Sequence, residues 1–206
     1  MADSYTGLGT ITAKWLREPH WANTPKVEFP MARQVISFPG TITAIEQESP
    51  SVPLIREFTF LSFSKAEEYE LLSFFCEKQG RLKKFWIPSW VSAFTLKSAI
   101  TIASNEIKVN NVNFNKVYSG YERIRLLLSN GDTIVRKIIN VEETDKTEEV
   151  LTVDTVFDRS IAVGSVVLFD LFLLCRSDID SFQLEYVSAG VSECRVRVAE
   201  LIREYP

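Results

Sequence analysis

The sequence predicts a mainly β protein: a β-sandwich with one packed α-helix, plus an inserted small β-barrel-like subdomain. Short runs of β-branched and aromatic residues, separated by proline and turn residues, recur along most of the 206 residues. Only residues 64–79 combine helical spacing with start and stop signals. Near residue 96 the runs become shorter and alternate more regularly. We therefore expect residues 1–95 and 169–206 to form the sandwich with its helix, and residues 96–168 to form the insertion.

The first part of the chain contains three runs typical of strands, at Gln34–Phe38, Gly40–Glu46 and Arg56–Phe63. In the third run, phenylalanines fall on both faces when side chains alternate along a strand. A strand with apolar residues on both faces is normally covered on both sides. We therefore expect this strand to lie inside a covered sheet.

A helix is predicted to begin at Ser64, which forms an S-x-x-E capping box with Glu67. The Glu67 side chain is expected to reach back to the Ser64 amide. Lys78 lies in the last turn, and Gly80 supplies a left-handed closing residue. The apolar residues expected to face the sheet are Tyr69, Leu72, Phe75 and Cys76, widened by Leu71 and Phe74.

An aromatic strand follows the helix after a basic turn at residues 81–84, which we expect to be solvated. The run F-W-I-P-S-W at residues 85–90 is rich in strand-forming residues and ends near Pro88. Phe85 and Ile87 are expected in the core. Alternation directs Trp86 the other way, so it either covers the opposite face or contributes to an interface.

Within the insertion, Asn130-Gly131 predicts a type I′ hairpin turn joining residues 123–128 to residues 133–139. The continuously apolar run from Ser165 is expected to lead back into the main core. Two further strands, residues 181–187 and 191–202, would complete the first sheet. No repeat of 20 to 50 residues is present.

Bulk properties restrict the function. The net charge of −4, from 23 basic and 27 acidic residues, argues against a specific nucleic-acid binder. No apolar run is long enough to span a membrane, and no signal-peptide pattern is present. The three cysteines, Cys76, Cys175 and Cys194, lack metal-ligand spacing, so we expect reduced, buried thiols.

The sequence offers little catalytic chemistry. Its single histidine, His20, has no partner nearby in the sequence, and we expect it to be packed or on the surface. Asp178 and Asp180 have the D-x-D form of cation ligands, but such pairs are common in turns. The acidic stretch at residues 142–149 is interpreted as a solvated loop, with a partner or ion site as the alternative. We expect no enzyme activity, cofactor or metal.

One pattern points to a family. The helix ends in F-F-x-x-x-x-G-R and is followed by F-W-I-P-S-W; the opening carries Trp15, Pro19, Trp21 and Pro25. Together with the ending, residues 185–202, this pattern resembles bacteriophage tail-tip proteins of the distal-tail and minor-tail type. The resemblance covers the beginning of the chain, through the aromatic strand, and its end. Its motifs are aromatic and structural rather than chemical.

The resemblance implies a structural virion protein located at the tail tip and assembled in the cytoplasm of the bacterial host. Such a protein forms a closed ring, with three-fold or six-fold symmetry, that connects the tail tube to a hub or fibres and meets the tape-measure protein. DNA passes through the bore without specific binding, and no membrane partner is implied. The candidate subunit contacts are Trp15, Trp21, Phe85, Trp86 and Trp90.

A second function class remains open at this stage. A carbohydrate-binding β module involved in attachment to the host surface would present aromatic rings on which sugars stack. The candidates for those rings are the pair Trp86 and Trp90 or the pair Tyr118 and Tyr121.

Overall fold

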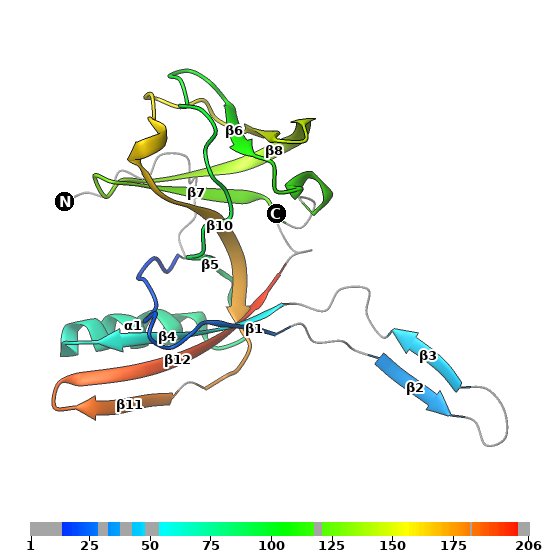
Figure 1. Cartoon of the computed structure of the whole chain (residues 1–206). Helices are drawn as coiled ribbons and strands as arrows, with labels where there is room; N and C mark the ends of the chain where they lie inside the picture. The colour runs from blue at the N-terminus through cyan, green and yellow to red at the C-terminus, as the bar shows by residue number, and fades with distance from the viewer. Residues whose placement is uncertain are drawn as a thin grey trace. The chain divides into compact units, whose positions relative to one another are not determined.

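The computed structural model describes residues 14–28, 33–37, 43–47, 54–117, 121–181 and 183–201. These residues form a mainly β fold with one α-helix, which confirms the predicted class (Figure 1). They fall into two compact units. We call residues 14–17 and 85–174 the insertion unit, and residues 18–84 and 175–201 the helix unit.

The unit boundaries differ from the predicted division at residues 96 and 168. Strand β5 (Phe85–Pro88) pairs with β10 (Val166–Ser177) in the insertion unit. The chain after β5 stays on the same strand, because the Ser89 amide donates to the Leu171 carbonyl and the Ala93 amide to the Phe169 carbonyl. Backbone hydrogen bonds thus place the aromatic strand with the insertion.

The helix unit is built on antiparallel strands in the order β1 (Lys26–Glu28), β4 (Ile55–Ser62), β12 (Val191–Glu200). Strand β11 (Gln183–Ser188) and the last three residues of β10 also pair with β12. The β4–β12 register places Phe58 opposite Val196 and Phe60 opposite Cys194. These four side chains are buried and form an apolar face.

Helix α1 (Lys65–Lys78) packs on β4, as Figure 1 shows. Leu71 and Phe75 are buried, as predicted, but Tyr69 and Cys76 are exposed. The predicted stripe is therefore corrected: the helix is rotated so that Glu68, Leu71, Phe75 and Lys78 form the buried set. Two charged side chains can occupy this face because each has an ionic partner, Lys65 for Glu68 and Glu77 for Lys78.

The far face of β4 is less covered than predicted. Thr59 is buried, yet Phe63, which follows the strand, is 67% exposed. Charged residues occupy much of this face, and Arg197 of β12 pairs with Glu28 of β1 at 3.1 Å. The expectation of apolar cover on both sides is thus wrong at the end of the strand.

Strands β2 (Arg33–Ser37) and β3 (Thr43–Gln47) form an antiparallel hairpin, with Val35 opposite Ile45. Both lie where the sequence predicts strands. Within the part of the chain that the structure describes, they form a two-stranded sheet of their own.

In the insertion unit, an antiparallel sheet runs in the order β10, β7 (Arg123–Leu128), β8 (Thr133–Asp145), β9 (Glu148–Val153), β6 (Glu106–Asn110). The strands do not close into a barrel. Instead, residues 93–97 bond to both ends of the sheet: Ala93 donates to Phe169 of β10, and Lys97 donates to Lys108 of β6. Among the described residues, short 3-10 helices lie at Phe114–Lys116 and Val163–Ser165.

The core of this unit is apolar and lies between the sheet and the connecting segments. Phe94 contacts both Phe114 and Phe169, with ring centroids 4.9 Å apart in each pair. Buried aliphatic side chains surround these rings, among them Ile107, Ile124, Leu126, Ile134, Leu151 and Val153. The predicted β7–β8 hairpin is present, but only Gly131 of its Asn-Gly pair has a positive φ, of 87°. A type I′ turn requires two such residues, so that prediction is wrong.

Candidate functional site

The five aromatic residues proposed as subunit contacts do not share one environment. Trp15, Phe85, Trp86 and Trp90 are 4%, 1%, 6% and 3% exposed, whereas Trp21 is 48% exposed. The four buried side chains lie in the insertion unit and Trp21 lies in the helix unit. Burial leaves the first four little area for contact with another molecule. Only Trp21 offers a surface of the predicted kind.

Trp86 is covered by residues of its own chain. Its ring stacks on Phe172 at a centroid distance of 5.6 Å and an interplanar angle of 9°. The Arg123 guanidinium lies over it at 5.1 Å, a cation–π contact. The Trp15 amide donates to the Trp86 carbonyl at 3.0 Å. Of the two alternatives left by the alternation pattern, cover of the opposite face is therefore the one observed.

Trp90 adopts a left-handed backbone conformation, with φ of 53°. Its amide donates to Oδ2 of Asp170 at 2.9 Å. Asp170 also receives two hydrogen bonds from Arg125, Nε to Oδ1 at 2.9 Å and a terminal nitrogen to Oδ2 at 2.8 Å. Burial raises the pKa of the Asp170 carboxyl, while the bonds from Arg125 and Trp90 favour the charged form. This bidentate pair holds the turn after the aromatic strand.

The carbohydrate alternative requires exposed rings. Trp86 and Trp90 are buried, and Tyr121 is half-buried against the apolar core. Tyr118, the remaining ring proposed, lies outside the described residues. The pair Trp86 and Trp90 therefore provides no flat surface on which a sugar could stack.

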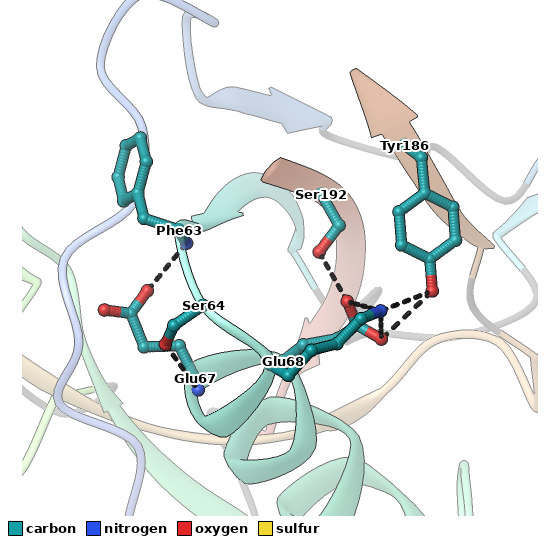
Figure 2. A network of polar contacts seen from close by, with 7 residues as sticks. Phe63, Ser64, Glu67, Glu68, Tyr186 and Ser192 are labelled. Atoms are coloured by element: carbon teal, nitrogen blue, oxygen red, sulfur yellow. Dashed lines mark hydrogen bonds and ion pairs between the residues drawn. The ribbon is translucent and has the colours of Figure 1, made fainter. Parts of the chain in front are cut away.

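The N-terminus of α1 is the clearest polar arrangement of the helix unit (Figure 2). The Glu67 amide donates to Oγ of Ser64 at 3.2 Å, as the capping box predicts. The Glu67 carboxylate accepts from the Phe63 amide at 2.9 Å. The sequence predicts that the Ser64 amide donates to the Glu67 carboxylate. The observed donor is instead the amide of the preceding residue, Phe63.

Glu68 holds this end of the helix to the β11–β12 hairpin, and Figure 2 shows its carboxylate between the surrounding donors. It accepts from Lys65 Nζ at 2.9 Å, Tyr186 Oη at 3.0 Å and Ser192 Oγ at 3.2 Å. The Lys65 ammonium also lies 4.6 Å from the centre of the Tyr186 ring. We call Lys65, Glu68, Tyr186 and Ser192 the Glu68 clamp.

A serine, a lysine, a tyrosine and a carboxylate in contact invite comparison with a catalytic site. The bond from Lys65 is the main reason that the pKa of Glu68 is lowered, so this carboxylate is ionised and is no proton donor at neutral pH. The bond to Glu68 likewise raises the pKa of Lys65, which remains protonated and cannot act as a base. Ser192 is 2% exposed. These states suit a structural clamp rather than nucleophilic catalysis.

The D-x-D motif and the basic turn bind each other. The Arg81 amide donates to Oδ1 of Asp180 at 3.0 Å, and Nε of Arg81 donates to the Asp178 carbonyl at 2.6 Å. Gly80, with φ of 60°, allows this approach: a Cβ there would lie 2.5 Å from Oδ1 of Asp180 and 2.9 Å from its Cα. The motif therefore holds the turn that follows the helix, and residues 81–84 are exposed, as predicted.

The acidic stretch is only partly a solvated loop. Glu149 is fully buried and accepts from the amides of Val112 at 3.1 Å and Asn115 at 3.0 Å. The neighbouring Glu148 pairs with Lys97 at 3.1 Å. The run of acidic residues in the sequence does not indicate that Glu149 is buried, because the amides that bind it lie more than thirty residues earlier in the chain. In the described ranges, no three acidic, histidine or cysteine side chains are grouped as metal ligands.

The remaining buried groups are also structural. Glu200 is buried beside Arg56 and forms a short ion pair with it, and burial raises the pKa of the Glu200 carboxyl. Burial raises the pKa of Cys194 to about 11 and that of Cys175 well above its ordinary value, so both thiols are protonated. Cys76 is exposed, which corrects the prediction that all three are buried. The backbone of His20 bonds to Thr59, and its ring is half-buried.

Comparison with known proteins identifies no family: no protein-family model matches the chain, and no curated protein matches it. Across the described residues, no helix combines the length and the apolar character needed to cross a membrane.

Proposed function

We propose that this protein is a structural subunit of a bacteriophage tail tip, in which identical copies form a ring between the tail tube and the hub or fibres. The observation that carries the proposal is the β2–β3 hairpin. It forms a separate two-stranded sheet among the described residues. Such a hairpin is marginally stable in water and gains stability when a further strand or surface covers it. A neighbouring copy supplies that surface in a ring.

The buried charges support a structural role. Asp170 is bound by Arg125, Glu200 by Arg56, and Glu149 by two backbone amides. Each carboxylate serves to hold one part of the chain to another. None of the three is available as an acid or base for a substrate.

In this proposal the copies contact one another in a head-to-tail manner, because a ring requires heterologous contacts that close. The protein has no enzymatic activity and no cofactor. Its partners are the tube, tape-measure, hub and fibre proteins of the same particle. DNA passes through a bore lined by acidic or neutral side chains, to which phosphates do not adhere. A bore dense in lysine and arginine would contradict this last point.

The proposal is tested by measuring the mass of the purified full-length chain with light scattering and imaging it in negative stain. A closed ring is expected, alone or after addition of the tail-tube protein. In the double variant Val35→Asp/Ile45→Asp, the ring should be lost while the circular dichroism spectrum is retained. The control Gln34→Asp/Thr43→Asp places equal charge on the same strands and should affect the ring less, because the apolar positions are kept. A protein that stays monomeric under all these conditions would refute the proposal.

A further inference from the structure

Strand β11 presents an open edge. It pairs with β12 along one side, from Gln183 opposite Arg195 to Ser188 opposite Val191. Along its other side, no strand is present among the described residues. All of its residues except Leu184 are exposed. Its unpaired amides and carbonyls can therefore accept a further strand.

Two other ends of the larger sheet, β1 and β6, are protected. Strand β1 has only three residues, two of them charged, Lys26 and Glu28, and short charged edges resist pairing. The outer side of β6 is occupied by the preceding segment, because Lys97 donates to Lys108 and Asn110 donates to Thr95. In contrast, β11 has the sequence Q-L-E-Y-V-S, without lysine or proline. Apart from the separate β2–β3 hairpin, it is the long unprotected edge of the helix unit among the described residues.

Two large apolar side chains of this strand are exposed. Tyr186 and Val187 are 61% and 64% exposed. Exposed apolar groups along an unprotected edge favour association with another chain.

The Glu68 clamp fixes the position of this edge before any partner arrives. Tyr186 lies in the middle of β11, and its hydroxyl donates to Glu68 of α1 at 3.0 Å. Ser192, opposite Tyr186 on β12, bonds to the same carboxylate. A strand held in this way loses little conformational freedom on pairing, which favours binding.

We infer that the open edge of β11 pairs with the β2–β3 hairpin of a neighbouring copy, so that each copy completes a sheet of the next. This inference rests on the proposed function, since it names the contact that builds the ring. Five-residue strands in the hairpin match the six residues of β11 in length. Contact between unlike surfaces continues around an axis, whereas pairing of β11 with β11 stops at a dimer.

The first test places a photo-crosslinking amino acid at Glu185, an exposed residue in the middle of β11. Copies grown in ¹⁴N and ¹⁵N media are mixed, assembled and irradiated, and cross-linked peptides are identified by mass spectrometry. Mixed-isotope products should join β11 to residues 33–47. The same amino acid at Leu82, which is 72% exposed in the same unit, should not give these products.

The second test compares two substitutions of equally exposed valines. Val187→Lys adds a charge to the open edge, and Val167→Lys adds the same charge to β10 in the insertion unit; each valine is 64% exposed. Val187→Lys should weaken self-association about tenfold, a change readily resolved in the apparent dissociation constant. Val167→Lys should leave association unchanged, and both monomers should remain folded.

The outcomes separate this inference from the function on which it rests. If rings form but the cross-links from Glu185 join segments other than residues 33–47, the pairing of β11 with the hairpin is overturned while the proposed function stands. Isolated dimers cross-linked from β11 to β11 would overturn it as well. Failure of the protein to assemble in any condition would overturn both.

Discussion

The guanidinium of Arg125 and the carboxylate of Asp170 form a bidentate ion pair in the interior of the insertion unit, 45 residues apart in the sequence. Their side chains are 4% and 0% exposed. The strands that carry them, β7 and β10, are neighbours, and the two residues lie opposite each other in the register. Because Asp170 also accepts from the Trp90 amide, the pair connects two strands and the turn that follows β5.

Removing one member of this pair should destabilise the protein strongly. Arg125→Met leaves a buried carboxylate that is held by backbone amides and has lost its ionic partner, and breaking a buried ion pair typically costs about 3–5 kcal/mol. The measurement is the free energy of unfolding in urea. As a control, Arg195→Met removes an exposed pair with Glu193 and should cost less than about 1 kcal/mol. Equal losses for the two variants would contradict a special role for the buried pair.

Trp86→Ala should lower the stability of the monomer. The side chain is buried against Phe172 and Arg123, and truncation of a buried tryptophan typically costs about 3–5 kcal/mol. Thermal unfolding at a concentration where the protein is monomeric measures the effect. Trp21→Ala, at the exposed tryptophan, should change stability by only about 0.5 kcal/mol. If Trp86 served only as a contact between subunits, its removal would leave monomer stability unchanged.

Gly80→Ala should be more destabilising than Gly190→Ala. Both glycines have positive φ, 60° and 93°, so alanine costs about 1–2 kcal/mol at either position through backbone strain. Only at Gly80 does the added Cβ also meet Asp180, at 2.9 Å from its Cα, whereas nothing lies within 4 Å at Gly190. Equilibrium denaturation of the two variants separates the collision from the strain. Equal destabilisation would show that the turn at Asp180 moves aside without cost.

The stabilisation provided by Glu68 should disappear in acid. Its bond from Lys65 lowers the pKa of the folded-state carboxyl below the ordinary value of 4.5. A group with a lowered pKa contributes its full stabilisation above the ordinary value and loses it as the pH falls through the folded-state pKa. The difference in free energy of unfolding between the wild type and Glu68→Gln should therefore be constant near neutral pH and shrink below pH 4.5.

Glu200 supplies a comparison of opposite sign. Burial raises the pKa of Glu200 above its ordinary value of 4.5, so the ionised carboxylate costs stability above the folded-state pKa. That cost is removed as the pH falls through the folded-state pKa toward 4.5. On acidification the wild type should thus gain stability relative to Glu200→Gln as the pH falls toward 4.5, and should lose its advantage over Glu68→Gln only below that value. Parallel pH profiles for the two variants would contradict the assigned environments.

The local elements were readable because their signals lie within a few residues of one another. Ser64 caps α1 and Lys78 lies in its last turn, as the spacing predicts; the left-handed C-cap is Gln79, and Gly80, the predicted closing residue, follows it with a positive φ as well. The strands β2, β3, β4, β7 and β8 also lie where alternation and turn residues place them. Backbone geometry and hydrogen bonding over one turn or one hairpin decide these features.

The candidate site was less predictable, because exposure depends on residues that are distant in the sequence. Trp86 looks like an interface residue from its alternation with Phe85, but Phe172 and Arg123 cover it. From the sequence, Glu149 is expected in a solvated acidic loop, but in the structure its carboxylate accepts hydrogen bonds from the amides of Val112 and Asn115. Neither partner leaves a local signal, so no pattern within the acidic stretch or the aromatic strand indicates burial.

The sequence by itself thus determined the mainly β class, the single capped helix and most strand positions, since these follow from short-range backbone preferences and periodicity. Tertiary structure alone decided which charges are buried, which aromatic rings are covered and where the units divide. The Arg125–Asp170 pair, the Glu68 clamp and the open edge of β11 all arise from strand pairing between distant segments. Pairing of this kind is selected by the packing and hydrogen bonding of the whole sheet, so it cannot be predicted from any single segment.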